Sequence, residues 1–305
     1  MNTASLFKSQ RGTTFVFFAL ILTVIVAFAA LSVDIGVIAY EKAKLANTVD
    51  SAALAGAQEL VTNASNTRNI TNNYISKNNS GLKSTTITIN ESARSVEVKS
   101  IKTVKNYFAN VFGNASQDVI ATAQAKVENI SALSGCRPIA VVKQTFIYGN
   151  IYVLKEGASD GYSGNYAAIS LGGSGASIYE DNLLNGYSGT IRVGDYIPTE
   201  TGVIAKKTSN SIETLISRCN HTPRCTHTYY NKKCSRIIFI PVVDTLYVNG
   251  KKHVKVLGFA TFFLEGAVNS GGHTDIIGRF ITYHADGETS TEINDYGTYG
   301  IKLVK

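Results

Sequence analysis

Charged residues are scarce in this chain. They make up 17% of its 305 residues, against about 25% in an average soluble domain. Trp is absent and only 4 Pro occur, whereas small polar residues are plentiful and Tyr occurs 16 times. This composition is typical of extracellular proteins that are rich in β-strands.

Concentrated positive charge is missing from most of the chain. The net charge is +7 at pH 7, and Lys8 and Arg11 carry two of these charges. The rest is spread thinly over the chain after residue 33, whereas nucleic-acid binding needs basic side chains clustered on one face. The sequence therefore predicts no nucleic-acid partner.

Signatures of catalysis are also scarce. The H-E-x-x-H pattern of zinc proteases does not occur, and His253, His273 and His284 are scattered along the chain. A catalytic triad is defined in space rather than in sequence, so a hydrolase is not excluded. We expect a non-catalytic protein with no cofactor and no metal. The alternative is an exported carbohydrate-binding or hydrolase module in residues 136–305.

An uncharged apolar run at residues 13–33 is the most prominent feature that is present. Lys8 and Arg11 precede it, and Asp34 follows at once. A helix of this length rises about 31 Å, which is enough to cross a hydrocarbon core of about 30 Å. Basic residues before a span favour a cytoplasmic N-terminus. We therefore expect a single-pass cell-membrane protein with residues 1–12 in the cytoplasm, residues 13–33 in the lipid bilayer, and the bulk of the chain outside.

Three other interpretations of this run are open. A cleaved signal peptide would use Ala27-Phe28-Ala29 as its cleavage site, but the run is longer than a usual signal core. A buried core helix would normally show a polar face. A prepilin-type N-terminus would explain Gly12 after a basic leader, but Phe17 stands where pilins normally have Glu.

Helical periodicity continues beyond the apolar run to about residue 61, with Gly36 and Gly56 as its weak points. A short polar helix is expected around Tyr74. Residues 84–90 and 95–104 alternate at period two and predict a β-hairpin. A short helix at 105–112 and a long strand at 117–130 follow. We expect a pilin-like α+β module at residues 34–135, in which the amphipathic part of the long helix packs on a small three-stranded sheet.

The first part of this pattern is similar to a known family. Gln10-Arg11-Gly12 leads into the apolar run, Val33-Asp34-Ile35-Gly36 ends it, and Leu45-Ala46-Asn47-Thr48-Val49-Asp50-Ser51-Ala52-Ala53-Leu54-Ala55-Gly56-Ala57 follows. Residues 10–60 resemble the N-terminal domain of TadG-like proteins of the tight-adherence (Flp) pilus assembly system. The resemblance implies an envelope protein linked to pilus assembly or surface attachment. Its partners would be pilus-assembly proteins or other copies of this chain. A pilin-like structural subunit of an extracellular filament is the alternative.

Residues 136–305 show short apolar runs separated by Gly-rich turns. Strands are expected at 138–147, 149–155, 166–171, 189–193, 236–248, 253–265 and 277–284. Asn249-Gly250 is a strong hairpin signal between two of the longest. We expect a β-rich sandwich or irregular barrel in this extracytoplasmic domain. The predicted fold class is therefore α+β.

The four cysteines are Cys136, Cys219, Cys225 and Cys234. An even number in an exported domain favours two disulfides, and we predict Cys219 with Cys225 and Cys136 with Cys234. The last three cysteines also lie near His221 and His227, so zinc and a reactive free thiol are alternatives. Their spacing matches no common zinc pattern.

The only basic cluster of the sequence lies in the same segment. It consists of Arg218, Arg224, Lys232, Lys233 and Arg236, with no acidic residue between Glu213 and Asp244. Such a cluster could contact an anionic cell-wall polymer or another acidic partner. A plain solvated loop is the alternative.

Overall fold

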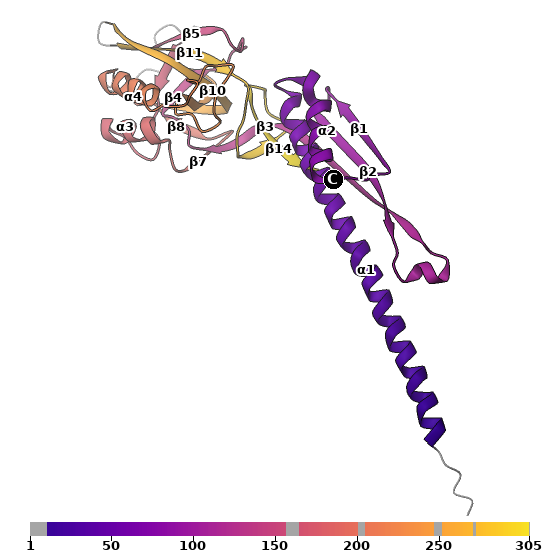
Figure 1. Ribbon diagram of the computed structural model, residues 1–305. Helices are drawn as coiled ribbons and strands as arrows, with labels where there is room; N and C mark the ends of the chain where they lie inside the picture. The colour runs from indigo at the N-terminus through magenta and orange to yellow at the C-terminus, as the bar shows by residue number, and fades with distance from the viewer. Residues whose placement is uncertain (1–10, 157–164, 201–204, 247–251, 271–272, 305) are drawn as a thin grey trace, which may run out of the picture. The chain divides into compact units, whose positions relative to one another are not determined.

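The computed structural model describes residues 11–156, 165–200, 205–246, 252–270 and 273–304 (Figure 1). The α+β class is confirmed: a long helix packs on strands, and two mixed sheets with short helices follow. The chain divides into two compact units. The first comprises residues 1–59, 65–125 and 303–305, and the second comprises residues 60–64 and 126–302.

Helix α1 (Arg11–Leu60) is continuous, as the periodicity predicts (Figure 1). It is long and apolar enough to cross a membrane. The large side chains of its first half, such as Phe15 and Phe28, are exposed. Its second half buries one face, where Leu45 packs with Val104 and Val119 from the strands. The sequence pattern of a fully apolar half and an amphipathic half is therefore reproduced.

Strands β1 (Ser84–Asn90) and β2 (Ser95–Lys105) form the predicted antiparallel hairpin. Strand β3 (Ser116–Ser134) lies beside β2 and is longer than expected. Helix α2 (Thr67–Asn78), preceded by the short 3-10 helix η1 (Ala64–Asn66), follows α1. The helix expected at 105–112 is only the 3-10 turn η2 (Ala109–Phe112).

The sheet that contains these strands is larger than the predicted three strands. Its order is β1-β2-β3-β14-β12, with β7 and β13 also paired to β3. The second half of β3 belongs to the second unit, where it pairs with β7 (Thr190–Arg192) and β13 (Glu288–Ser290). Strand β14 (Thr298–Leu303) runs parallel to β12 (Tyr283–His284).

The second sheet has the order β11-β5-β6-β4-β9-β10-β8. Its strands are β4 (Ile139–Val142), β5 (Ile151–Glu156), β6 (Asn165–Ala168), β8 (Tyr196–Pro198), β9 (Ile237–Val243), β10 (His253–Ser270) and β11 (His273–Ile281). Strand β4 is parallel to β9, and β5 is parallel to β6, so the sheet is mixed. The turn predicted at Asn249-Gly250 lies outside the described residues.

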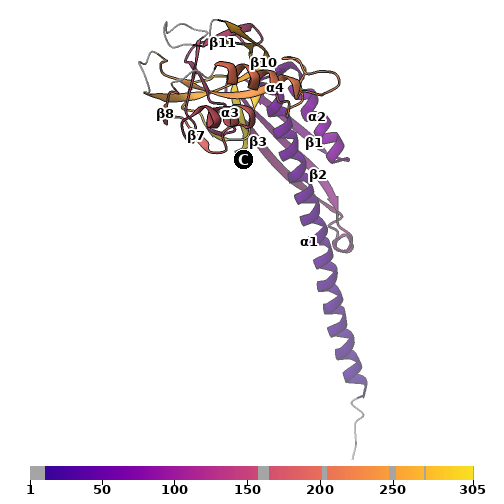
Figure 2. The same cartoon turned by 90° about the vertical axis from the view of Figure 1, so that its left-hand side faces the viewer.

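Two helices of the second unit were not predicted. Helices α3 (Ala176–Asn185) and α4 (Ala205–Ser217) lie side by side (Figures 1 and 2). Leu183 of α3 and Ile212 of α4 share one hydrophobic core with Phe262 and Phe280 of the second sheet. The region is thus β-rich as predicted, but two helices complete its core.

Candidate functional site

The segment between α4 and β9, residues 218–236, contains no helix or strand. Irregular segments longer than about 12–15 residues are uncommon in compact domains, and they are usually functional loops or linkers. Three of the four cysteines lie in this segment, and all three are buried.

Cys219, His221, Cys225 and Cys234 form one cluster. Their ligand atoms all lie within 4.8 Å of one another. The Sγ of Cys219 is 3.4 Å from the Sγ of Cys234 and 3.7 Å from Nδ1 of His221. In a tetrahedral zinc site the ligand atoms lie about 3.6–3.8 Å apart, as follows from Zn–S and Zn–N bonds of about 2.3 and 2.0–2.1 Å. The cluster therefore has the size that one zinc ion needs.

Backbone hydrogen bonds fix the position of each cysteine. The N–H of Cys219 donates to the carbonyl of Ile216 at 3.3 Å, at the end of α4. The N–H of Cys234 donates to the carbonyl of Asn231 at 2.9 Å, and the N–H of Asn231 donates to Sγ of Cys225 at 3.4 Å. Backbone donors to sulfur stabilise the thiolate form that metals bind.

Arg236 lies against this cluster and is buried. Its guanidinium donates to the carbonyls of Cys225 and Leu264, both at 2.8 Å, and stacks 4.4 Å from the ring centroid of Phe263. No carboxylate among the described residues forms an ion pair with it. A buried positive charge is costly without a nearby negative charge, so the cluster beside Arg236 is a favourable place for thiolate.

The cluster separates the pKa values of two of its thiols. Burial alone raises the pKa of Cys219, but hydrogen bonds with His221, with the backbone of Cys225 and with Cys234 outweigh it and lower this pKa to about 6. Burial raises the pKa of Cys234 to about 12.

The predicted disulfides are not present in the structure, since all four cysteines are free thiols. Cys136 lies in another core cluster with Ala140 and Ile169, away from the three sulfurs of the cluster. Burial raises the pKa of its thiol far above the ordinary value. The geometry corresponds instead to the zinc alternative, with His221 included and His227 left out.

The predicted basic cluster is only partly on the surface. Arg218, Arg224, Lys232 and Lys233 are exposed around the cysteine cluster. Arg236 is buried under it and cannot contact a polymer. An anionic partner would therefore meet four of the five predicted basic residues.

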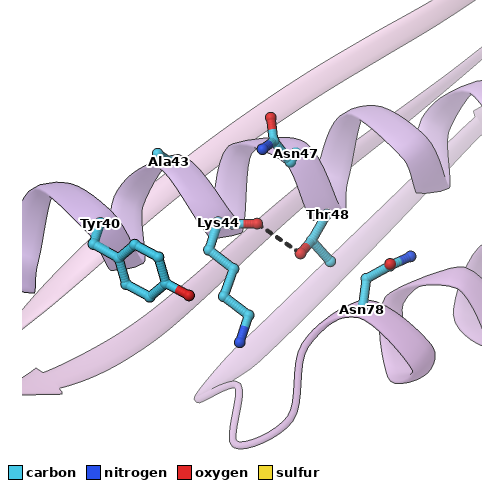
Figure 3. Close-up of a pocket in the computed structure, with 6 residues that line it drawn as sticks. All are labelled: Tyr40, Ala43, Lys44, Asn47, Thr48 and Asn78. Carbon is cyan, nitrogen blue, oxygen red and sulfur yellow. Dashed lines mark hydrogen bonds between the residues drawn. The ribbon is translucent and has the colours of Figure 1, made fainter.

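A shallow hollow of about 320 Å³ lies between α1 and the end of α2 in the first unit (Figure 3). It is lined by Tyr40, Ala43, Lys44, Asn47, Thr48 and Asn78. The Thr48 hydroxyl is engaged with the carbonyl of Lys44 at 2.8 Å. This lining contains the cation of Lys44 and the phenol of Tyr40, and no carboxylate, thiol or imidazole.

Asp34 is the second notable polar site of the described chain. Although it follows the apolar run directly, it is buried. Its carboxylate accepts the backbone N–H groups of Ala109, Tyr107 and Phe108, the nearest at 2.7 Å. It therefore caps the start of η2, and the N–H of Ala109 in particular lowers the pKa of Asp34. The sequence showed Asp34 as part of a motif but not this contact.

One further segment contains a sequence motif that also occurs in hydrolases. Gly157-Ala158-Ser159-Asp160-Gly161 has the G-x-S-x-G form of hydrolase nucleophile turns. It lies outside the described residues. A nucleophile turn is followed by a helix, whereas strand β6 begins here at Asn165.

Comparison with known proteins bears on the first unit alone. No curated protein and no solved structure matches the chain. Residues 12–59 match the family model described as putative Flp pilus-assembly TadE/G-like. These residues make up nearly all of α1, with Asp34 near their middle. The chain therefore carries, at residues 12–59, a Tad domain of the TadE/G-like Flp pilus-assembly family.

Proposed function

We propose that this chain is a single-pass membrane protein of the cell envelope that takes part in Flp-type pilus assembly or in surface attachment and has no catalytic activity of its own. The observation that carries the proposal is the Tad domain at residues 12–59, which coincides with α1. A lipid bilayer would surround residues 13–33. Lys8 and Arg11 favour a cytoplasmic N-terminus, which places both β-sheets outside the cell.

The exposure of α1 supports the bilayer as its surroundings. Large apolar side chains point outward on all sides of its first half, and Phe15, Phe17 and Phe28 are each more than half exposed. Exposed apolar side chains in such a continuous band are covered by lipid or by another protein. The same band would suit a filament core, which is the alternative role as a pilin-like subunit.

Aromatic residues near Asp34 support a membrane surface at that level. Asp34 holds the loop between β2 and β3 against α1 through its hydrogen bonds with the loop backbone. Tyr107 and Phe108 of that loop and Tyr40 of α1 are exposed. Aromatic side chains collect at membrane–water interfaces, so these three would lie among the lipid headgroups.

The outer part of the chain would supply the contacts with pilus-assembly proteins or with other copies. The exposed Arg218, Arg224, Lys232 and Lys233 are the residues that we propose for an anionic cell-wall polymer. Such contacts weaken as salt rises. Replacing all four by Gln should therefore abolish any salt-sensitive binding to isolated walls.

Fractionation and protease treatment of intact cells test the proposal. We expect the chain in the membrane fraction, resistant to carbonate extraction, with its β-sheets digested from outside and residues 1–12 protected. A soluble cytoplasmic chain would contradict the proposal. Recovery of the chain in sheared, purified filaments would favour the pilin-like role instead. Hydrolase activity that Ser159→Ala abolishes would overturn the non-catalytic assignment.

A further inference from the structure

We propose that Cys219, His221, Cys225 and Cys234 bind one structural Zn²⁺ ion. The four side chains come from one irregular segment, and their ligand atoms already lie within 4.8 Å of one another. Closing this distance to the spacing of a zinc site requires movements of about 1 Å or less. The proposal does not depend on the membrane role.

The donor set selects the metal. Three thiols and one imidazole are soft and borderline ligands, which suit zinc and exclude Ca²⁺ and Mg²⁺, because these prefer oxygen. Four protein ligands fill a tetrahedral shell and leave no position for water, as in structural rather than catalytic zinc sites. All three cysteines are buried, and His221 is half-buried, in agreement with a closed site.

Charge balance supports the same assignment. On binding, the three thiols lose their protons to solvent and no electron is transferred, so zinc with three thiolates and a neutral imidazole has a net charge of −1. The guanidinium of Arg236 donates to the carbonyl of Cys225, one of the ligands, at 2.8 Å. The described carboxylates provide no partner for this buried cation. The zinc centre would supply the missing negative charge.

The ion would hold the irregular segment to both of its neighbours in sequence. Cys219 lies two residues after the end of α4, and Cys234 lies three residues before the start of β9. Cys225 comes from the middle of the segment, after the cis peptide bond between Thr222 and Pro223. One ion would therefore join the beginning, middle and end of residues 218–236. This explains how a segment without helix or strand is held on the sheet.

A disulfide between Cys219 and Cys234 is the competing outcome, because their sulfurs are 3.4 Å apart. Disulfides are favoured outside the cytoplasm. Oxidation would leave Cys225 as an unpaired thiol and would give His221 no role. The two outcomes differ in metal content and in the number of free thiols, so one experiment separates them.

The test uses the full chain, purified in detergent without chelator and equilibrated with Zn²⁺. Elemental analysis should find about one zinc ion per chain, and alkylation after removal of zinc and unfolding in denaturant should label four thiols, since Cys136 is buried in the folded chain. Substitution with Co²⁺ should give the visible bands of tetrahedral cobalt together with thiolate-to-cobalt charge transfer. His221→Ala should weaken zinc binding by about tenfold or more.

Two matched variants serve as controls. His227→Ala removes the other histidine of the same segment, whose Nδ1 is 4.0 Å from Glu265 Oε1, and should keep full zinc content. Cys136→Ser removes the buried thiol outside the cluster and should also keep it. The proposal is overturned by wild-type protein with four free thiols and no zinc, by a Cys219–Cys234 disulfide, or by equal loss of zinc in His221→Ala and His227→Ala. The wild-type cobalt spectrum decides the matter even if a variant fails to fold.

Discussion

At the scale of single residues, Asp34 connects two segments that are distant in sequence. Its carboxylate accepts the backbone N–H groups of residues 107–109. The sequence of α1 gives no sign of this contact. Residues before and after it are exposed, and the carboxylate itself is buried. The stability of the β2–β3 loop should therefore depend on the charge of this one residue.

We predict that Asp34→Asn lowers the melting temperature and removes part of the acid sensitivity of the first unit. The hydrogen bond from Ala109, followed by those from Tyr107 and Phe108, holds the folded-state pKa of Asp34 below its ordinary value of 3.8. Because folding lowers this pKa, the ionised carboxylate stabilises the fold at pH values above 3.8. The stabilisation is lost as the pH falls below 3.8 and through the folded-state pKa. Thermal unfolding between about pH 2 and 6 measures the effect.

Asp50→Asn is the matched control for this prediction. Asp50 lies on the same helix, and the side chains and backbone of the described residues give its carboxylate no hydrogen-bond donor. Its replacement should change the melting temperature little at any pH. Equal effects of Asp34→Asn and Asp50→Asn would contradict the role that we assign to Asp34.

At the scale of elements, Gly56 sets how closely α1 approaches its neighbours. A methyl group at this position would overlap the hydroxyl of Thr71 in α2 and come within 3.2 Å of Val96 Cγ1 in β2. The Thr71 hydroxyl is buried and donates to the carbonyl of Thr67 at 2.8 Å, so it cannot turn away freely. In contrast, no atom lies within 4 Å of the same position at Gly36.

We therefore predict opposite effects for two identical substitutions in one helix. Gly56→Ala should destabilise the protein by about 1–3 kcal/mol, because overpacking forces α2 or β2 to move. Gly36→Ala should be neutral or stabilising by up to about 1 kcal/mol, because Ala favours the helix and meets no neighbour. Chemical unfolding in detergent measures both. A stabilising Gly56→Ala would contradict the close contact of Gly56 with Thr71 and Val96.

The loop that contains η2 provides a test of the membrane boundary. Val111 at this loop is 83% exposed, and the chain contains no Trp. Val111→Trp would therefore be the sole Trp of the protein. In nanodiscs, we predict a blue-shifted emission that brominated lipids quench, because Asp34 keeps the loop at the end of the apolar run.

Tyr74→Trp is the control reporter, since Tyr74 is also exposed and lies in the same unit. Its helix packs beside Gly56, which is about 30 Å along α1 from Asp34 at 1.5 Å per residue. Brominated lipids should leave this Trp unquenched. Water-like emission from both reporters would place the membrane surface farther toward the N-terminus.

The helices and strands differ in how well they can be predicted from the sequence. The hairpin β1–β2 was predicted to within one residue of its observed bounds, because strict alternation identifies a strand with one buried face. Helix α4 was missed because its buried face is built mainly from Ala205, Thr208, Ser209 and Ser211, with only Ile212 and Leu215 as large apolar residues. Helix α3 was missed because glycines precede and follow it. Small or polar side chains are buried only where a partner surface covers them. The periodicity of the sequence does not reveal that surface.

At the scale of the whole molecule, the candidate zinc site also could be predicted only in part from the sequence. The sequence supplied its ligand types, and zinc was among the interpretations. It could not show that Cys136 lies in another core cluster, nor that His221 rather than His227 joins the sulfurs, because both depend on the path of residues 218–236. The disulfide prediction paired Cys219 with Cys225 because they are close in sequence, and this left Cys136 with Cys234. Burial in two different clusters makes them unequal.

Because the chain divides into two units, we predict which of them responds to removal of zinc. The zinc ligands belong to the second unit, whereas Leu45, Val104 and Val119 form a separate core in the first. If zinc holds residues 218–236, a chelator should speed hydrogen exchange there and in the adjoining α4 and β9, since the loop would lose the bonds that restrain it. Exchange in β1 and β2 should stay unchanged.

Exchange measured by mass spectrometry on the full chain, with and without chelator, provides the comparison, and His221→Ala without chelator should reproduce the pattern. Faster exchange throughout both units would mean that the ion stabilises the entire fold rather than this segment. No change at residues 218–236 would mean that the protein's own contacts, such as those of Arg236 with Cys225 and Leu264, are sufficient to hold it.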